Sequence, residues 1–164
     1  MSEFADKQIT SEQSLSDQLQ NFASVADLVR TVMVSSTKLS REHMEQAARA
    51  YLVSYLTADI DGRAALFADD AIFEDPVGAT PICGLPAIVK FWQGAKDIRW
   101  WAAHDVRRIV VCGNEVMLHF VSTMRVPGLK KAAMEVFEQQ VFNDAGKIAH
   151  VRAYFDADCL VYSP

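Results

Sequence analysis

The sequence predicts an α+β fold in which helices come first and long antiparallel strands follow. Between residues 15 and 58, apolar side chains recur mostly at spacings of three and four, the period of amphipathic helices. Between residues 99 and 156, four β-rich runs are separated by short turns typical of hairpins. Helices gathered at one end and a strand meander at the other are typical of an α+β layer fold, since a parallel sheet requires alternating strands and helices.

Length and composition restrict the class of protein. With 164 residues, 51% hydrophobic and 23% charged, the chain can bury a substantial core as a soluble domain without disulfides or metals. Its net charge of −5 argues against a nucleic-acid partner, whose phosphates require a basic surface. No apolar run approaches the ~20 residues that span a membrane, and the polar start is unlike a secretory signal. We therefore expect no membrane association and a cytoplasmic location.

Two long helices and one short helix are expected before the first strand. The first lies in an N-terminal extension, residues 1–39, whose apolar stripe runs from Leu15 to Met33. Ser40 is a good N-cap for the second helix, to about residue 58, because its hydroxyl can accept a hydrogen bond from an early amide. A short third helix is expected at residues 63–67. We therefore assign residues 40–164 to the main domain.

A first, short strand is expected to end at Asp75, in the segment LFADDAIFEDPVG. Pro76 lacks an amide hydrogen and restricts the preceding residue to extended geometry, so the Asp75 carboxylate should be held at a strand end. Alternation from Ile72 places Asp75 on the same face as Phe73, where desolvation would raise its pKa toward that of a general base. An aspartate before proline is equally an ordinary turn residue, and the pattern leaves both interpretations open.

The second half predicts one more helix and the strand meander. A short strand near Ile82 and a helix over residues 85–95 follow the first strand. The four long strands are expected near residues 99–111, 115–126, 132–143 and 147–156.

Neither face of the third long strand is purely apolar, and one face has Glu138 and Gln140 between Val136 and Phe142. They indicate either a solvated sheet surface or polar groups set into an apolar pocket. The adjacent strands each have a mostly apolar face, which carries Phe120 in one and Phe155 in the other. These faces form either a packed core or a cleft for a flat, apolar ligand.

Cysteine and histidine spacing gives no indication of a metal site. Cys83, Cys112 and Cys159 are odd in number and far apart, so we expect reduced, partly buried thiols rather than disulfides or a zinc site. The four histidines are scattered and include no pair spaced for metal binding on one helix.

Three segments resemble the ketosteroid isomerase family, the steroid Δ5-isomerases of the NTF2-like superfamily. They are YLVSYLTADIDGRAALFADDAIFEDPVG, ATPICGLPAIVKFW and FEQQVFNDAGKIAHVRAYF, within residues 51–155. The resemblance is vague over residues 97–130 and does not include the N-terminal helix. It implies a cystatin-like, cone-shaped barrel with N-terminal helices packed on a curved antiparallel sheet around an apolar pocket.

The same resemblance assigns catalytic roles to three residues. Asp75 falls on the proton-shuttling base, and Tyr51 falls on the oxyanion-hole tyrosine. Glu138 falls where the family has a second oxyanion donor, an aspartic acid kept protonated by its apolar surroundings. The extra methylene of glutamate displaces the carboxyl group, and misplacement on the order of 1 Å can cost ~100-fold in rate.

The resemblance also implies a ligand pocket and a reaction. Phe67, Phe120 and Phe155 fall on steroid-cleft positions, and Trp92 replaces a tyrosine that in some members hydrogen-bonds the oxyanion tyrosine. An indole cannot accept such a bond, so the supporting network must differ. The implied activity is isomerisation of a steroid-like apolar ketone by a homodimer without cofactor or metal. A SnoaL-like polyketide cyclase and an NTF2-like small-molecule binding protein without turnover are the alternatives.

Overall fold

The computed structural model describes residues 22–32 and 37–162. The chain divides into two units, residues 1–36 and 37–164, and each is considered by itself. In the first unit the described helix is α2, Val25–Val32, and the Ser24 hydroxyl accepts a hydrogen bond from the Asp27 amide at 3.1 Å. Residues 22–24, which were predicted as part of the first helix, are not helical, and the rest of that prediction lies outside the described residues. No helix among the described residues is long and apolar enough to cross a membrane.

The second unit starts with α3, Arg41–Thr57, which forms as predicted. The Ser40 hydroxyl accepts a hydrogen bond from the His43 amide at 3.1 Å and so caps the helix. The predicted apolar stripe is buried, with Tyr51 among its largest side chains. The next helix, α4, covers Ile60–Ala64 and so begins before the predicted start at residue 63. The Asp59 side chain caps it by accepting from the Gly62 amide at 2.8 Å.

The first strand, β1, covers Phe67–Glu74 and is longer than predicted. The acidic pair Asp69 and Asp70 lies on this strand, where a register shift interrupts the pairing with β6. The partner explains the difference, because β1 pairs in parallel with β6, Ile148–Tyr154, far away in the sequence. A two-residue strand, β2, Ile82–Cys83, pairs antiparallel with the other edge of β1.

The remaining elements agree closely with the predicted meander. Helix α5 covers Leu85–Asp97, and the long strands are β3, Trp101–Cys112, β4, Glu115–Arg125, and β5, Ala132–Phe142. A short C-terminal strand that was not predicted, β7, Leu160–Tyr162, pairs with β5.

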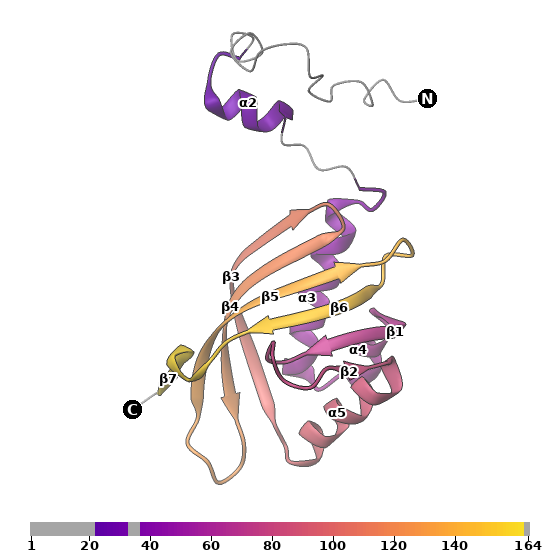
Figure 1. Cartoon of the computed structure of the whole chain (residues 1–164). Coiled ribbons are helices and arrows are strands. Elements are labelled where there is room, and N and C mark those ends of the chain that lie inside the picture. The colour runs from indigo at the N-terminus through magenta and orange to yellow at the C-terminus, as the bar shows by residue number, and fades with distance from the viewer. Residues whose placement is uncertain (1–21, 33–36, 163–164) are drawn as a thin grey trace. The chain divides into compact units, whose positions relative to one another are not determined.

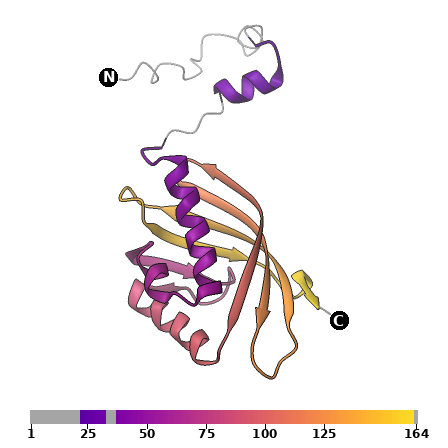
Figure 2. The same ribbon diagram turned by 180° about the vertical axis from the view of Figure 1, so that it is seen from behind.

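The sheet is curved and open. Its strand order is β2-β1-β6-β5-β4-β3, and every pair except β1–β6 is antiparallel. Figures 1 and 2 show the strands curling around one side, with α3 lying across the concave face and α5 beside β1 and β2. This arrangement confirms the predicted α+β architecture with helices packed on a curved, mainly antiparallel sheet.

The two faces of the sheet differ as the alternation predicted. Leu118, Phe120, Val136, Phe142 and Val151 point inward and are buried in the core. His119 and Arg152 lie on the outer face, where His119 pairs with Glu135 and Arg152 with Glu74.

The cysteines are free thiols, but the prediction of partial burial holds only for Cys159. Cys83 and Cys112 are exposed because each is the last residue of an edge strand, β2 or β3.

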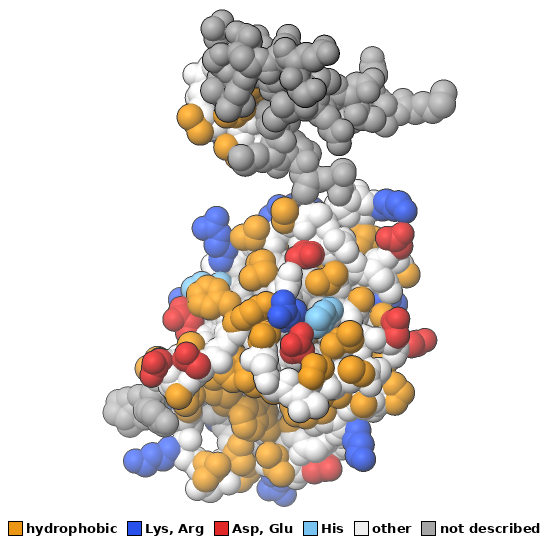
Figure 3. Space-filling view, viewed as in Figure 1, with side chains coloured by type: hydrophobic (Ala, Val, Ile, Leu, Met, Phe, Trp, Pro, Cys, Tyr) orange, Lys and Arg blue, Asp and Glu red, His pale blue; other side chains and the backbone are white. Residues whose placement is uncertain are grey.

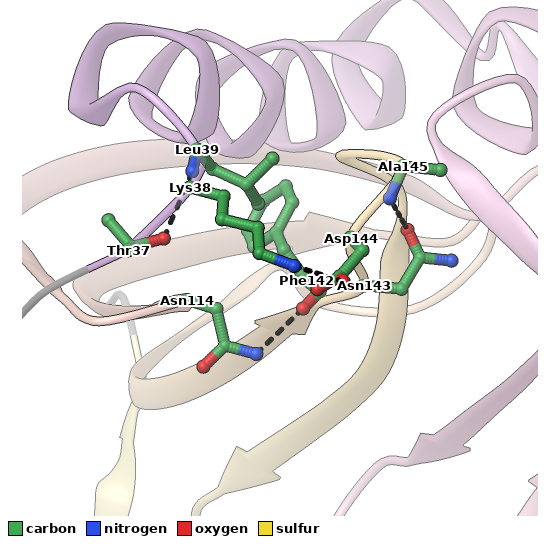
Figure 4. Close-up of polar contacts among 8 residues, drawn as sticks. All are labelled: Thr37, Lys38, Leu39, Asn114, Phe142, Asn143, Asp144 and Ala145. Atoms are coloured by element: carbon green, nitrogen blue, oxygen red, sulfur yellow. Dashed lines mark hydrogen bonds and ion pairs between the residues drawn. The ribbon is translucent and has the colours of Figure 1, made fainter. Parts of the chain in front are cut away.

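Polar contacts fix the start of α3 against the turn between β5 and β6 (Figure 4). Lys38 Nζ lies 3.2 Å from a carboxylate oxygen of Asp144 in this turn, and His43 Nε2 lies 2.8 Å from the Gly146 carbonyl oxygen. The Asn114 amide donates to the Phe142 carbonyl oxygen at 2.8 Å and so joins this end of β5 to the β3–β4 turn. The start of α3 therefore contacts the β5–β6 turn.

Candidate active site

A cavity of about 910 Å³ lies between α3, α5 and the concave face of the sheet. Most of its lining is apolar and aromatic. The polar side chains that reach it are Tyr51, Tyr55, Asp75, Lys90, His104, Ser122 and Glu138. The three residues predicted to act together, Tyr51, Asp75 and Glu138, therefore line one cavity although they come from three separate segments of the chain.

Asp75 follows the last residue of β1 and faces the cavity. The backbone beyond it is anchored to β6, because the Val77 amide donates to the Ala153 carbonyl oxygen at 2.8 Å. By accessible surface Asp75 is an exposed residue, because its side chain opens onto the cavity, and its desolvation comes from the protein packed around the cavity walls. This desolvation raises the pKa of Asp75 from 3.8 to about 6. The carboxylate is consequently ionised at neutral pH and far more basic than an ordinary aspartate.

Glu138 lies on the inward face of β5 and is only 4% exposed. The Gln140 side-chain amide donates to Glu138 Oε1 at 2.8 Å. Burial raises the pKa of Glu138 from 4.5 to about 8; Gln140 and Tyr51 act against this increase, and the Asp75 charge adds to it. Glu138 is therefore a buried pocket acid rather than a solvated strand residue, and near neutral pH its carboxyl group is mainly protonated.

Tyr51 is 2% exposed, and its phenol forms a hydrogen bond with the Tyr55 phenol, with the two oxygens 3.0 Å apart. Burial raises the pKa of Tyr51 well above 10, and the charges of Glu138, Tyr55 and Asp75 raise it further. The Tyr51 phenol thus remains protonated and can donate a hydrogen bond to an oxygen atom in the cavity.

Tyr55 and His104 also line the cavity, and Arg63 is buried against the Tyr55 ring; sequence reasoning did not identify these three residues. The spacing of four residues between Tyr51 and Tyr55 could have indicated a pair on one helix face. His104 makes edge-on ring contacts with Tyr55 and with Phe120, at centroid distances of 5.2 and 4.9 Å. Burial and the charge of Arg63 lower the pKa of His104 to about 4, so its imidazole is neutral.

Of the four aromatic residues predicted to line the pocket, three line the cavity and one is buried behind it. Trp92, Phe120 and Phe155 line the cavity. Phe67 is buried behind it, with ring-centroid distances of 5.8 Å to Tyr51 and 5.1 Å to Trp92. The Trp92 indole nitrogen has no hydrogen-bond partner among the described residues, so the hydrogen bond to Tyr51 comes from Tyr55.

Comparison with known proteins gives consistent relatives. Residues 48–151 match the family described as SnoaL-like domain. Over 128 residues the chain is 30% identical to the steroid Delta-isomerase of Nocardioides simplex, a match that covers 74% of this chain and 99% of that protein.

Solved structures with a similar fold include natural and designed proteins. The epoxide hydrolase/cyclase-like enzyme SalBIII superimposes with a TM-score of 0.68 at 16% identity, covering 76% of this chain and 98% of that chain. A computationally designed 17-OHP binder also gives 0.68, at 19% identity, and covers 74% and 98%. At these identities the two structures share the fold with this chain.

Proposed function

The chain belongs to the SnoaL-like family of the NTF2-like superfamily, and from this premise we propose that it is a cofactor-independent isomerase. It moves a carbon–carbon double bond in a 3-oxo-Δ5-steroid or a similar apolar ketone. Asp75 is the base, and Tyr51 and Glu138 form the oxyanion hole. The observation that carries the proposal is that the carboxyl groups of Asp75 and Glu138 and the phenol of Tyr51 line one mainly apolar cavity, whose surroundings raise the pKa of both acids.

These pKa values suit two different tasks. Between about pH 6 and 8, Asp75 is mainly ionised and can accept a proton, whereas Glu138 is mainly protonated and can donate a hydrogen bond. Pairs of acids whose surroundings separate their pKa values in this way are characteristic of acid–base catalysis. A solvated pair of carboxylates would be ionised together and could not divide the work.

The reaction requires a base and an oxyanion hole on the same substrate. The Asp75 carboxylate removes the proton from the carbon between the ketone and the double bond, and the electron pair moves onto the carbonyl oxygen as a dienolate. The Tyr51 phenol and the protonated Glu138 donate hydrogen bonds to that oxygen. Asp75 then returns the proton two carbons further along, the carbonyl re-forms, and the double bond is conjugated with it. No atom is gained or lost.

The cavity suits an apolar substrate of steroid size. Its volume is about 910 Å³, and Phe91, Ile98 and Trp100 line it while remaining substantially exposed, as expected where it opens to solvent. Figure 3 shows hydrophobic side chains gathered on the lower part of the molecule, between β7 and α5. The similarity to the steroid Delta-isomerase of Nocardioides simplex supports a steroid as the class of ligand.

The direct test is conversion of 5-androstene-3,17-dione to its conjugated 4-ene isomer, followed by ultraviolet absorbance. Asp75→Asn should lower kcat by orders of magnitude while leaving binding of apolar ligands largely intact. Asp105→Asn is the matched control, because Asp105 is exposed on β3 and pairs with Arg107 at 2.9 Å. A wild-type protein that binds steroids without turnover would contradict the isomerase and favour a binding protein. Turnover of a polyketide instead would favour a SnoaL-like cyclase.

Glu138→Asp tests the oxyanion hole. If the extra methylene of Glu138 displaces the donor on steroid substrates, the shorter acid should raise kcat for 5-androstene-3,17-dione. No change in kcat would indicate that Glu138 is already placed for a different substrate.

We further propose that two copies associate through the outer face of the sheet. Val110, Met117, Phe137 and Tyr154 expose apolar surface on this face. Exposed apolar patches of this kind are often interaction sites. Light scattering after size-exclusion chromatography should give the mass of a dimer, and Phe137→Glu should give that of a monomer. A monomeric wild-type protein would exclude this arrangement.

A further inference from the structure

Arg63 is a buried cation beside the site that takes no part in the reaction described above. It lies on α4 and is 4% exposed. Its Nε donates to the Ser54 hydroxyl at 2.8 Å, and none of the ion pairs among residues 37–162 involves it. A buried charge without a countercharge is costly, so its neighbours must compensate for lost water.

Aromatic rings supply that compensation. The Arg63 guanidinium carbon lies 3.4 Å from the centroid of the Tyr55 ring and 4.9 Å from that of Trp92. Both distances are within the range of cation–π attraction. The guanidinium is therefore held directly against one of the two tyrosines that line the cavity.

The same contacts connect Arg63 to Tyr51 by two routes. The Ser54 hydroxyl, which accepts from Arg63, donates to the Tyr51 backbone carbonyl at 2.5 Å. The Tyr55 ring, which faces Arg63, carries the phenol that hydrogen-bonds the Tyr51 phenol at 3.0 Å. Side chains from α3 and α4 thus fix the orientation of both tyrosines.

We propose that Arg63 and Tyr55 extend the oxyanion hole, so that the guanidinium charge and the second phenol stabilise negative charge on an oxygen bound by Tyr51. Both act through Tyr51 and are positioning residues, not groups that transfer a proton. This inference rests on the proposed isomerase site, because it assigns the cation to the oxygen end of the same cavity.

The Arg63 charge acts on the two groups that lie beside it. Burial raises the pKa of Tyr55 above its usual range, and the Arg63 charge is the largest effect opposing this increase. The charge also adds to burial in lowering the pKa of His104.

A cation at this position favours catalysis. Negative charge moves from the Asp75 carboxylate to the substrate oxygen as the proton is removed. A fixed cation against the Tyr55 ring, whose phenol is hydrogen-bonded to that of Tyr51, stabilises the charge that develops on an oxygen bound by Tyr51. An interaction that is stronger in the transition state than in the ground state increases kcat rather than binding.

The first experiment measures oxyanion stabilisation without turnover. 4-Nitrophenol is bound to full-length protein carrying Asp75→Asn, so that no Asp75 charge repels the phenolate, and its ionised fraction is read by absorbance across pH. Arg63→Met should raise the apparent pKa of the bound phenol by about one unit, a tenfold change in ionisation. Tyr55→Phe should raise it in the same direction, and Arg63→Lys should raise it less than Arg63→Met.

Arg125→Met is the matched control. Arg125 also faces an aromatic ring, with its guanidinium carbon 5.0 Å from the centroid of Trp101, but it is exposed and neither residue lines the cavity. Its removal should leave the ionisation of bound 4-nitrophenol unchanged. If Arg63→Met fails to fold, the ionisation of 4-nitrophenol bound to Tyr55→Phe and to Arg63→Lys tests the proposal instead, since each of these variants keeps a side chain of similar size.

Kinetics with 5-androstene-3,17-dione separate this inference from the proposed function. Arg63→Met and Tyr55→Phe should each lower kcat about tenfold, with KM nearly unchanged. The rise of kcat/KM with pH that reports ionisation of Asp75 should stay at the same pH. If Arg63→Met and Tyr55→Phe both turn over the steroid with the wild-type kcat, and the ionisation of bound 4-nitrophenol is also unchanged, the role of Arg63 is overturned. The proposed isomerase activity is then unaffected. Ionisation that depends on Arg63 in a protein without steroid turnover would overturn the isomerase alone.

Discussion

The two faces of strand β5 carry the same residue types in opposite environments. Gln139 and Gln140 are neighbours, and each donates its side-chain amide to a glutamate, Gln139 to Glu115 at 2.6 Å on the outer face and Gln140 to Glu138 at 2.8 Å on the inner face. Glu135 lies on the same strand, three residues before Glu138, and faces outward. Strand β5 therefore has one glutamate and one glutamine on each face, Glu135 and Gln139 outside and Glu138 and Gln140 inside.

The difference lies in what replaces water around each carboxyl group. On the outer face, Glu135 is 2.6 Å from His119 and half exposed, and Glu74 contacts both His150 and Arg152. On the inner face, Glu138 has a neutral amide as its hydrogen-bond donor and is almost fully buried. A carboxylate with a cation nearby can remain charged, whereas one in an apolar cavity is stabilised by taking up a proton. Chemical reactivity here depends on the environment more than on residue type.

The largest contrast is expected between inner and outer tyrosines. Tyr51→Phe removes an oxyanion donor from the cavity and should lower kcat by about 100- to 1,000-fold, the usual effect of losing one such donor. Tyr154→Phe, on the outer end of β6, should leave kcat for 5-androstene-3,17-dione near the wild-type value. Equal losses in the two variants, measured by steady-state kinetics, would remove the distinction between the faces.

The next contrast uses the two glutamates of β5. Glu138→Gln keeps the shape and still offers an amide donor, but a weaker one, so kcat should fall about 10- to 100-fold. Glu135→Gln should change kcat very little, because it affects only a partly exposed hydrogen bond with His119 on the outer face. A variant at position 138 with wild-type kcat would show that this acid does not contact the reacting oxygen.

The pH dependence should reveal both inner acids. Asp75 must be ionised, so kcat/KM should rise with pH up to about 6; Glu138 must be protonated, so kcat/KM should fall as pH increases through about 8. Outside these limits the rate should change about tenfold per pH unit. Because the two groups interact, the limbs report the apparent pKa values of the pair. Glu138→Gln should lose the alkaline limb, and retention of that limb would assign it to another group.

The smallest effect is expected from the paired amides. Gln140→Leu removes the donor that opposes the increase in the pKa of Glu138, so the alkaline limb should move to higher pH, with a change in kcat of about a few-fold. Gln139→Leu should leave both limbs in place, since its partner Glu115 is on the outer face. Identical pH profiles for the two variants would show that Gln140 does not control the protonation of Glu138.

Elements with a strong local signal could be predicted closely. The cap at Ser40 and the apolar stripe of α3 specify that helix, and alternation specifies the inward faces of β4, β5 and β6. The prediction for β1 was less accurate, because its partner β6 is remote in sequence and pairs with β1 at Phe67 and again from Ile72, on either side of the acidic pair. Catalytic roles for Tyr51, Asp75 and Glu138 came from family resemblance and remain predictions.

The sequence by itself determined which residues share a face, since the helical and strand periods are local properties of the chain. It also determined that Asp75 is held at a strand end, because Pro76 restricts its backbone. The tertiary structure alone decided that the inward face of β5 borders an open cavity, that Arg63 is buried over Tyr55, and that Tyr55 supports Tyr51. The physical reason is that desolvation depends on the elements packed around a group. Burial by residues distant in the sequence raises the pKa values of Asp75 and Glu138, and no local pattern records it.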